Sequence, residues 1–354
     1  EEIGNIGSIK NAIGYLNRDR NIVTGGLAGY SMTLTNYEDK NALLEAFDKG
    51  DVSYILVPMI EYLDVILSKL YTIVYHLSDM KDYYYLANTD DAVLASIMSK
   101  FYNKWEEEKQ EESFLKSEYD LFVSKLRITE KELDALNNKK YRYGFLDFAP
   151  YDTKEGGVYG GLSAKYVENF SKLSGIEFEY DKYSSFSKFT KAISKGSVDL
   201  FTNYYTLETS MTNIWSLYGV DISFVMSNKD KRVVNNLNAI KDETVYVKEN
   251  TSLINTLKSL GVNTKTYEND KELKNIFEDN GIVAMEYAHY LVFKETSKTA
   301  NERFRQSTAK SLSFQSNNDA VFNKLFSYYV MTIDKNQILF TGLEDYYTAT
   351  RSGT

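Results

Sequence analysis

Two segments far apart in the chain share one pattern. Residues 37–47 read YEDKNALLEAF and residues 267–277 read YENDKELKNIF, and each runs into a glycine followed by a strand-like stretch. Further along, Asp91-Ala92-Val93 and Asp319-Ala320-Val321 each open an apolar, helix-like segment. Stacked repeats recur every few tens of residues, so an echo at this spacing predicts a duplicated domain instead of a solenoid. Because little chain precedes Tyr37, we expect the first copy to be incomplete.

Composition excludes several classes of function. The 354 residues suggest two or more domains, and the net charge of -9 argues against a nucleic-acid-binding surface. There is no cysteine, so disulfides, thiolate nucleophiles and Cys-based zinc sites are excluded. The only two histidines, His76 and His289, lie far apart, which disfavours a metal cluster or a His-based relay. We therefore expect no metal and no cofactor.

No enzyme motif stands out either. The sequence contains no serine nucleophile elbow and no phosphate-binding loop. The glycine-rich stretch 156–161 lacks the spacing of a dinucleotide fingerprint and reads as a loop before a helix. We expect a protein without catalytic activity, with any catalytic output domain outside this chain.

The chain carries no signal peptide at Glu1 and no apolar stretch suited to lipid. The longest one, Val52 to Leu67, is broken by Pro58, Glu61 and Asp64. We read the sequence as an excised soluble portion of an extracytoplasmic protein that is tethered to a membrane at full length.

The first part of the chain mixes strand and helix patterns. Expected strands are 5–9, 31–36, 52–57 and 70–77, and expected helices are 10–16, 38–49 and 90–104. Residues 105–126 are charged with a sparse apolar stripe, which indicates a partly exposed linker helix, with a coiled-coil partner site as the alternative. Thr129 and Glu132 have the spacing of a capping box.

From residue 141 onward, strands and helices alternate regularly. Expected strands are 141–145, 176–180, 198–203, 222–226 and 244–248, and expected helices are 161–175, 184–196, 209–217 and 251–259. Alternation of this kind predicts an α/β fold with parallel sheets covered by helices. Two such sheets in succession predict a two-lobed domain.

At this point the residues resemble a known family. Tyr143-Gly144-Phe145, then Ala149-Pro150-Tyr151 and Gly160 to Ala164, resemble the opening of the bacterial extracellular solute-binding proteins of the amino-acid-binding type, which have a Venus-flytrap fold. Further resemblance lies at 186–200, where a helix, a glycine and a "V-D" strand follow one another, at 268–286 and at 310–332.

The resemblance implies a domain layout. Residues 141–347 resemble a complete periplasmic-binding-protein-like (type II) module, with lobe 1 at 141–227 and 313–347 and lobe 2 at 228–312. Residues 1–104 resemble the second lobe and return segment of a partial module, 105–140 form a helical linker, and 348–354 form a tail toward a missing membrane segment. The junction 126–133 resembles the linker between tandem modules of bacterial membrane sensors.

Ligands of two-lobed α/β proteins lie between the lobes, where parallel strands end. Aromatic, amide and hydroxyl side chains follow the expected strands there, a helix start offers N–H groups to an anion, and a carboxylate could pair with an ammonium group. Asn250 and Thr251 could instead serve only as helix caps. The tyrosines could instead pack in the core, and His289 could take the place of the carboxylate. The candidate ligand-binding residues are Phe148, Tyr151, Asn203, Tyr204, Tyr205, Thr206, Asn250, Thr251, Ser252 and Glu286.

One departure from the family pattern bears on the ligand. The resembled amino-acid binders carry an arginine in a T-x-E-R pattern, and Thr209 stands in its place here. A hydroxyl cannot replace a guanidinium fork, so an α-amino acid held in the usual way is not expected. In the first copy the corresponding strand ends at Val57-Pro58, without a carboxylate.

These expectations converge on an extracytoplasmic sensor region of a bacterial transmembrane signalling protein, such as a histidine kinase or a cyclic-di-GMP enzyme. A small polar solute would close the lobes about hinges at 227–231 and 304–313, and the movement would pass to a membrane-anchored output domain of the same protein. Alternatives are the substrate-binding protein of an ABC transporter and a ligand-free interaction scaffold. We do not expect a nucleic acid as a partner, and the sequence does not decide whether the protein forms a homodimer.

Overall fold

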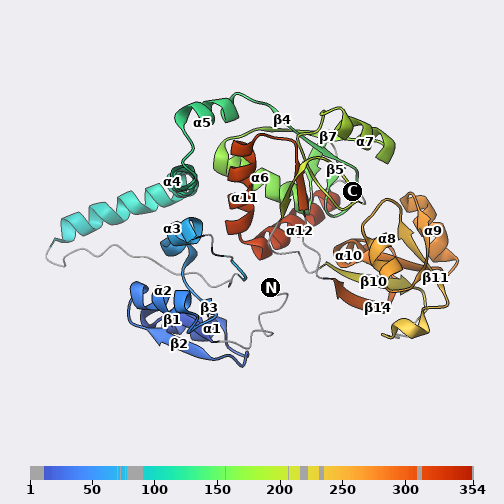
Figure 1. Ribbon diagram of the computed structural model, residues 1–354, viewed down its shortest axis with the longest axis horizontal. Coiled ribbons are helices and arrows are strands. Elements are labelled where there is room, and N and C mark those ends of the chain that lie inside the picture. The colour runs from blue at the N-terminus through green and yellow to red at the C-terminus, as the bar shows by residue number, and fades with distance from the viewer. Residues whose placement is uncertain are drawn as a thin grey trace. The chain divides into compact units, whose positions relative to one another are not determined.

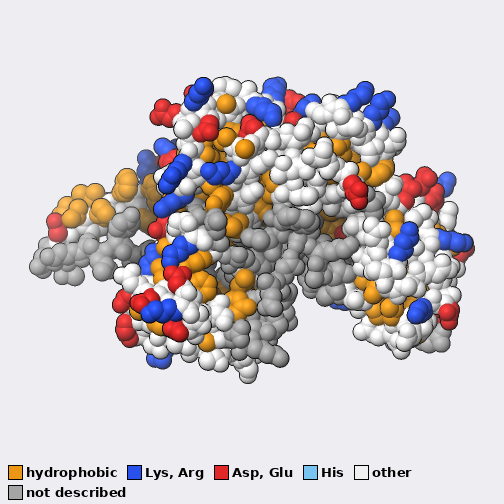
Figure 2. Space-filling view, viewed as in Figure 1, with side chains coloured by type: hydrophobic (Ala, Val, Ile, Leu, Met, Phe, Trp, Pro, Cys, Tyr) orange, Lys and Arg blue, Asp and Glu red, His pale blue; other side chains and the backbone are white. Residues whose placement is uncertain are grey.

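The computed structural model describes residues 12–352, apart from 70, 72, 76, 78–90, 156, 206, 216–221, 231–234 and 309–312. The chain forms two compact units: residues 1–133 with 172–174, and the remainder (Figure 1). On the face drawn in Figure 2, Lys and Arg side chains are interspersed with Asp and Glu side chains in both units. None of the helices in the described ranges is long and apolar enough to cross a membrane.

The first unit is built on a parallel three-stranded sheet of order β2-β1-β3. Its elements are β1 (Ile13–Leu16), η2 (Asn17–Asp19), α1 (Arg20–Gly26), β2 (Leu34–Tyr37), α2 (Lys40–Lys49), β3 (Tyr54–Ile55) and α3 (Met59–Lys69). Helix α2 confirms the prediction at 38–49: the Asp39 side chain accepts a hydrogen bond from the Ala42 N–H, and Gly50 ends the helix in the left-handed conformation.

The predicted helix at 10–16 is wrong, because its described part from Ile13 is a strand. All four residues of β1 are buried, since apolar residues pack on both faces of the sheet. A short apolar run of this kind has no period that separates a strand from a helix. The predicted strand at 5–9 lies outside the described residues, and the described residues between 70 and 77 have no regular secondary structure.

A single long helix follows. The predicted helix 90–104 and the predicted linker helix 105–126 are one element, α4 (Ala92–Leu126). Val93, Ile97 and Phe101 are each more than half exposed on it, at 71%, 58% and 66%. The capping box is confirmed at the start of α5 (Glu130–Asn137), where the Thr129 N–H donates to Glu132 and the Glu132 N–H donates to the Thr129 hydroxyl.

The second unit contains two five-stranded sheets, one in each lobe. The first lobe has the strand order β7-β4-β8-β15-β9, with β4, β7 and β8 parallel and β15 and β9 antiparallel to their neighbours. Its strands are β4 (Tyr141–Phe145), β7 (Phe178–Lys182), β8 (Leu200–Thr202), β9 (Thr212–Trp215) and β15 (Ser313–Ser316), beside a hairpin of β5 (Thr153–Glu155) and β6 (Val158–Gly160). Its helices are α6 (Leu162–Ser174), α7 (Phe186–Ser194), α11 (Ala320–Thr332) and α12 (Lys335–Ser352).

The second lobe has the strand order β12-β11-β13-β10-β14. Strands β11, β12 and β13 are parallel, and β10 pairs antiparallel with β13 and β14. Its elements are β10 (Ile222–Asn228), η3 (Leu237–Ala239), β11 (Thr244–Lys248), α8 (Leu253–Ser259), β12 (Asn263–Tyr267), α9 (Asp270–Glu278), β13 (Ile282–Glu286), α10 (Tyr287–Thr296) and β14 (Asn301–Thr308). A mixed α/β fold with two lobes was predicted, and it is confirmed.

Two predictions inside this unit are corrected. The described part of the helix predicted at 209–217 contains strand β9 instead, which pairs with β15 through residues 212–215. The predicted lobe boundary at 227/228 is misplaced, because β10 from Ile222 onward already lies in the second sheet and β14 stays in it to Thr308. The chain therefore changes sheet between 215 and 222 and again between 308 and 313, and residues 227–230 of the hinge predicted at 227–231 belong to the second lobe.

The sheet of the first unit shares its element order with the second lobe. In both, a central strand is followed by a helix, a flanking parallel strand, a second helix, the opposite parallel strand and a third helix. The second helices start alike, with Asp39 and Asn269 accepting backbone hydrogen bonds. A residue with positive φ follows each helix, Gly50 directly after α2 and Asn280 two residues after the end of α9. The repeated sequence segments occupy equivalent places in these two sheets.

Candidate functional site

The candidate residues follow the carboxyl ends of four parallel strands. Phe148 and Tyr151 come after β4, Tyr204 and Tyr205 after β8, and Thr251 after β11. Glu286 is the last residue of β13 and His289 lies in the first turn of α10. Strand ends of this type are where α/β sheets place their ligands.

Aromatic rings of the first lobe pack together at this edge. The ring centroid of Tyr204 lies 4.8 Å from that of Tyr151 and 5.7 Å from that of Phe148, and Phe148 and Tyr151 are 5.4 Å apart. Tyr205 packs edge-on against Phe189 of α7 at 5.6 Å. All of these side chains are buried.

The second lobe meets this aromatic group directly. The Ser252 N–H donates to the Tyr204 carbonyl at 2.9 Å, and Tyr205 forms a β-bridge with Thr251. The His289 ring lies edge-on to Phe148 at 5.4 Å, and the Lys248 ammonium is 5.6 Å from the Phe148 ring centroid. These contacts define what we call the lobe junction, formed by Phe148, Tyr151, Tyr204, Tyr205, Lys248, Thr251, Ser252, Glu286 and His289.

Burial governs the titration of the junction. Burial raises the pKa of Tyr151 well above its ordinary value, and the charge of Glu286, with which its hydroxyl forms a hydrogen bond, raises that pKa further. Burial, followed by the charge of Lys248, lowers the pKa of His289 to about 4. His289 is therefore neutral near neutral pH.

Most of the predicted site residues are brought together here, but two amides have local roles. The Asn203 side chain accepts from the Tyr205 N–H at 3.2 Å and donates to the Leu207 carbonyl at 3.1 Å, which shapes the turn after β8. Asn250 adopts a left-handed φ of 60°. Thr206 lies outside the described residues.

Helix capping, the alternative role for the residues before α8, does not occur. The Thr251 hydroxyl donates to the Lys248 carbonyl at 2.8 Å, and Ser252, the residue before the helix, makes no side-chain capping bond. These side chains instead shape the turn that carries the second lobe's backbone to Tyr204.

The first turn of α6 is tied to the same loop. Gly161 has a φ of 113°, and a Cβ there would lie 2.4 Å from the Tyr151 carbonyl oxygen. The N–H groups of Leu162 and Ser163 donate to the Pro150 and Tyr151 carbonyls, each at 2.9 Å. The start of this helix therefore fixes the loop that presents Tyr151.

The position matched to the family arginine is neutral and engaged within the first lobe. The Thr209 hydroxyl donates to the Gln315 side-chain oxygen at 2.8 Å. Gln315 is buried in β15 and its amide also bonds Asn213. Thr209 thus organises the antiparallel end of the first sheet.

Sequence analysis missed Asp152, which lies next to the junction. Its side chain is 1% exposed and accepts hydrogen bonds from Tyr159 at 2.6 Å and Tyr143 at 3.1 Å. Burial raises its pKa to about 7 from an ordinary 3.8. An acidic chain offers many carboxylates, and only the fold distinguishes this one by burial. Lys248 was missed because the chain has many lysines, and only the fold places this one beside the Phe148 ring.

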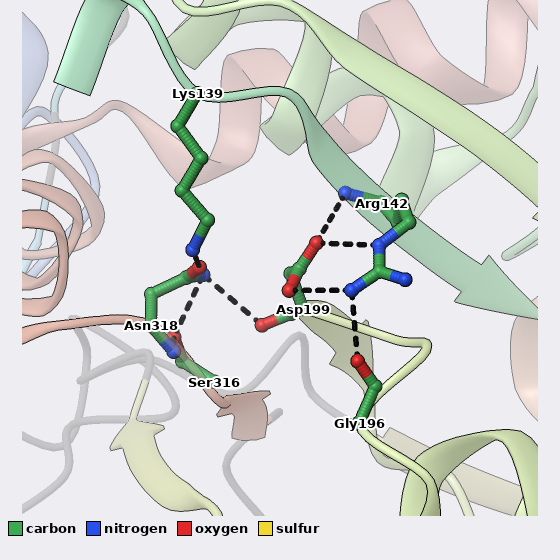
Figure 3. A network of polar contacts seen from close by, with 6 residues as sticks. All are labelled: Lys139, Arg142, Gly196, Asp199, Ser316 and Asn318. Atoms are coloured by element: carbon green, nitrogen blue, oxygen red, sulfur yellow. Dashed lines mark hydrogen bonds and ion pairs between the residues drawn. The ribbon is translucent and has the colours of Figure 1, made fainter. Parts of the chain in front are cut away.

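The aspartate of the "V-D" strand lies at the opposite, amino-terminal end of the parallel strands in the first sheet. Asp199 precedes β8 and forms a bidentate ion pair with Arg142, whose guanidinium also donates to the Gly196 carbonyl (Figure 3). Asn318 donates to the Asp199 carbonyl and accepts from Lys139. This network joins the starts of β4 and β8 to the turn before α11, away from the junction.

Comparison with known proteins identifies the fold. No family model and no curated protein matches the sequence. Among solved structures, the Bordetella pertussis BvgS periplasmic VFT2 domain matches with a TM-score of 0.50 and 14% identity, over 60% of this chain and 96% of that one. The later part of this chain has the Venus-flytrap fold.

Two further structures extend the comparison. The whole BvgS periplasmic domain of B. pertussis covers 99% of this chain and 74% of its own length, with a TM-score of 0.51 and 12% identity. An amino acid ABC transporter substrate-binding protein from Streptococcus pneumoniae, bound to L-arginine, covers 61% of this chain and 97% of its own, with a TM-score of 0.50 and 14% identity. The similarity to the BvgS periplasmic domain thus extends over the first unit as well as the two-lobed part of the chain.

Proposed function

We propose that this chain is the extracytoplasmic ligand-sensing region of a bacterial transmembrane signalling protein. A small polar solute binds at the lobe junction, and the lobes close upon it. The observation that carries this proposal is the meeting of four strand ends, two from each lobe, through buried aromatic, hydroxyl and carboxylate side chains. Closure transmits a signal because the ligand stabilises one arrangement of the lobes over others.

The sensor role is favoured by the extent of the structural similarity. The S. pneumoniae binding protein accounts for 61% of this chain, whereas the BvgS periplasmic domain accounts for 99%. A partial module followed by α4 serves no obvious purpose in a solute shuttle, which needs one pair of lobes. We infer that the partial module arose by duplication and passes on the state of the complete one. The output domain, a kinase or a cyclic-di-GMP enzyme, lies outside this chain, at the membrane.

The transporter role remains the second candidate. It is favoured by the similarity of the complete module to a substrate-binding protein over nearly the whole of that protein. In that case residues 141–352 would deliver a solute to a permease. Under either role the protein acts by binding, without catalysing a reaction.

The junction narrows the class of solute. Thr209 is neutral and bonded to Gln315, so it cannot hold a carboxylate as a guanidinium does. Lys248, the cation of the junction, faces the Phe148 ring. A solute with an apolar or aromatic body and polar groups for Glu286, Ser252 and the tyrosine hydroxyls fits this lining better than an α-amino acid held through its carboxylate.

Native mass spectrometry of the purified chain tests binding. We expect a small molecule to be retained by the wild-type protein and released on denaturation, where its mass identifies it. Thr251→Trp fills the junction and should abolish retention, and Tyr151→Ala should weaken it at least tenfold, equivalent to about 1.4 kcal/mol. Thr296→Trp, on the exposed end of α10, is the matched control and should retain the molecule. Equal retention by all four proteins would show that the junction is not the site.

A further inference from the structure

Asp152 is buried beside the lobe junction without a cation to balance it. Within the described part of the chain, its hydrogen-bond partners are tyrosine hydroxyls, and no lysine or arginine pairs with it. A carboxylate removed from water without a counter-charge is costly, so this surrounding favours the protonated form. The other titratable groups near it are Tyr143, Tyr159, Tyr204, Tyr205 and Asp147.

A hydrogen-bonded chain leads from this carboxyl to the end of β8. The Tyr143 hydroxyl lies 3.1 Å from Asp152 Oδ1 and 2.7 Å from Thr202 Oγ1, and either hydroxyl of the second pair can be the donor. When Asp152 is ionised, Tyr143 must donate to it and accept from Thr202. When Asp152 carries a proton, the chain can run in the opposite direction. A change in the protonation of Asp152 therefore alters the hydrogen bonding of Thr202, the last residue of β8, two residues before Tyr204.

The backbone ties the same residue to the aromatic rings. The Phe148 N–H donates to the Asp152 carbonyl at 2.8 Å, and the Asp152 N–H donates to the Phe148 carbonyl at 3.1 Å. Tyr151 closes this tight turn through its own N–H to Phe148. Phe148 contacts His289 in the second lobe, so a change at Asp152 acts on the contact between lobes.

We propose that Asp152 is a positioning residue whose proton favours the joined lobes, so that the arrangement of the lobes depends on pH. The proposal rests on the function proposed above, because it assigns a regulator to the same junction. With the proton present, the neutral side chain is stable in its dry site. After the proton leaves, the carboxylate favours any arrangement in which the turn 148–152 loosens and water reaches it.

The direction of the pH dependence follows from the linkage between proton binding and the arrangement of the lobes. Burial raises the pKa of Asp152 from 3.8 to about 7, so the buried arrangement binds the proton more tightly than a hydrated one. The contribution of this proton is fully present below the ordinary pKa, and it is lost as the pH rises through about 7. His289 does not titrate in this range, since its pKa lies at about 4. Glu286 and Lys248 are the other charged groups of the junction.

Lobe separation can be measured directly, because the chain has no cysteine of its own. Lys191→Cys on α7 and Lys274→Cys on α9 place one exposed site on each lobe for spin labels. Electron–electron double resonance on the full 354-residue chain then gives the distance distribution between about pH 5.5 and about pH 8.5. We expect the population of the shorter distances to rise toward the acidic end, by at most tenfold in the population ratio per pH unit below about 7, and to change little above it.

Variants separate Asp152 from other acids. Asp152→Asn keeps the shape of the neutral form and should hold the shorter distances across the range, whereas Asp181→Asn, an exposed acid on β7, should titrate like the parent. A pH-independent distribution in the parent would overturn the proposal, and so would an unchanged titration in Asp152→Asn. If Asp152→Asn does not fold, the carbon-13 shifts of labelled aspartate carboxyls in the parent replace it. An aspartate titrating near 7 is then expected, and its absence would overturn the proposal.

Failure of this proposal is distinguishable from failure of the proposed function. The distance measurement needs no solute, and the mass-spectrometric experiment is carried out at one pH. A pH-dependent junction that retains no solute would contradict sensing of a small molecule but not the role of Asp152. A junction that binds solute with distances independent of pH would contradict only the role of Asp152.

Discussion

Gly161 controls how the loop with Tyr151 meets helix α6. Its φ of 113° is a conformation that side chains disfavour, and a Cβ would lie 2.4 Å from one carbonyl oxygen and 2.6 Å from another. The first N–H groups of α6 bond those same two carbonyls, at Tyr151 and Pro150. The requirement for glycine therefore arises from the close approach of two backbone segments next to the site.

We predict that Gly161→Ala destabilises the second unit by roughly 3 kcal/mol, because strain in φ adds to the contact with backbone. Gly157→Ala is the matched control. Gly157 also has a positive φ of 87°, but nothing lies within 4 Å of its added Cβ, so roughly 1 kcal/mol is expected. Urea unfolding followed by near-ultraviolet circular dichroism measures both. Equal losses in the two variants would contradict the role of the close approach.

For single residues, the residue type and its position in the predicted elements were enough to predict part of the candidate site. Phe148, Tyr151 and Tyr204 are predicted because each follows a strand, and Thr251 because it starts a helix, and the structure brings them together. Asp152 could not be predicted as a site residue, because its distinguishing property is burial among tyrosines from other elements. That property arises from tertiary structure, and no local pattern in the sequence records it.

Elements with strong local signals were predicted well. Helix α2 was predicted at 38–49, and it begins where Asp39 accepts a hydrogen bond from the Ala42 N–H. Asn269 plays the same part at α9, where it accepts hydrogen bonds from the Lys271 and Glu272 N–H groups. These caps lie in the repeated segments, so the repetition preserves the start of a helix as well as its apolar face. Caps can be recognised in sequence because the interacting atoms are only two or three residues apart.

We predict that Asn269→Ala lowers stability by about 1 kcal/mol, since two backbone N–H groups lose their acceptor. Asn275, exposed within the same helix, is the control. Asn275→Ala should be neutral or slightly stabilising, because alanine is the better helix former. Chemical unfolding of the two variants measures the difference, and a loss at Asn275 as large as that at Asn269 would argue against capping.

Elements without local signals were predicted wrongly. Residues 212–215 were expected in a helix, but they form β9 by pairing with β15, about a hundred residues later in the chain. The same holds for β10, whose strand character was predicted but whose sheet was not, because its partners β13 and β14 are also distant. Strand pairing over long separations is decided by the fold and cannot be derived from a window of residues.

For the whole molecule, the repeated segments predicted a second copy of part of the fold. The first unit has the strand order β2-β1-β3, which matches β12-β11-β13 of the second lobe element by element. The two sheets differ at the strand end that faces the junction in the second lobe. There Glu286 ends β13, whereas Pro58 follows β3, and Arg18 and Glu61 form an ion pair at that edge of the first unit. The two copies are thus alike in their cores and different where a ligand would bind.

Each unit has a core of its own, so we predict two separate thermal transitions in calorimetry of the full chain. Leu43 in the first unit and Phe326 in the second are fully buried. Leu43→Ala should lower one transition and Phe326→Ala the other, each by an amount corresponding to roughly 2–5 kcal/mol. Ile60→Ala is the control, because this side chain of the first unit is 60% exposed and its loss should shift neither transition measurably. If both buried variants shift one common transition, the units fold as a single cooperative body, and a signal could pass between them through stability as well as through movement.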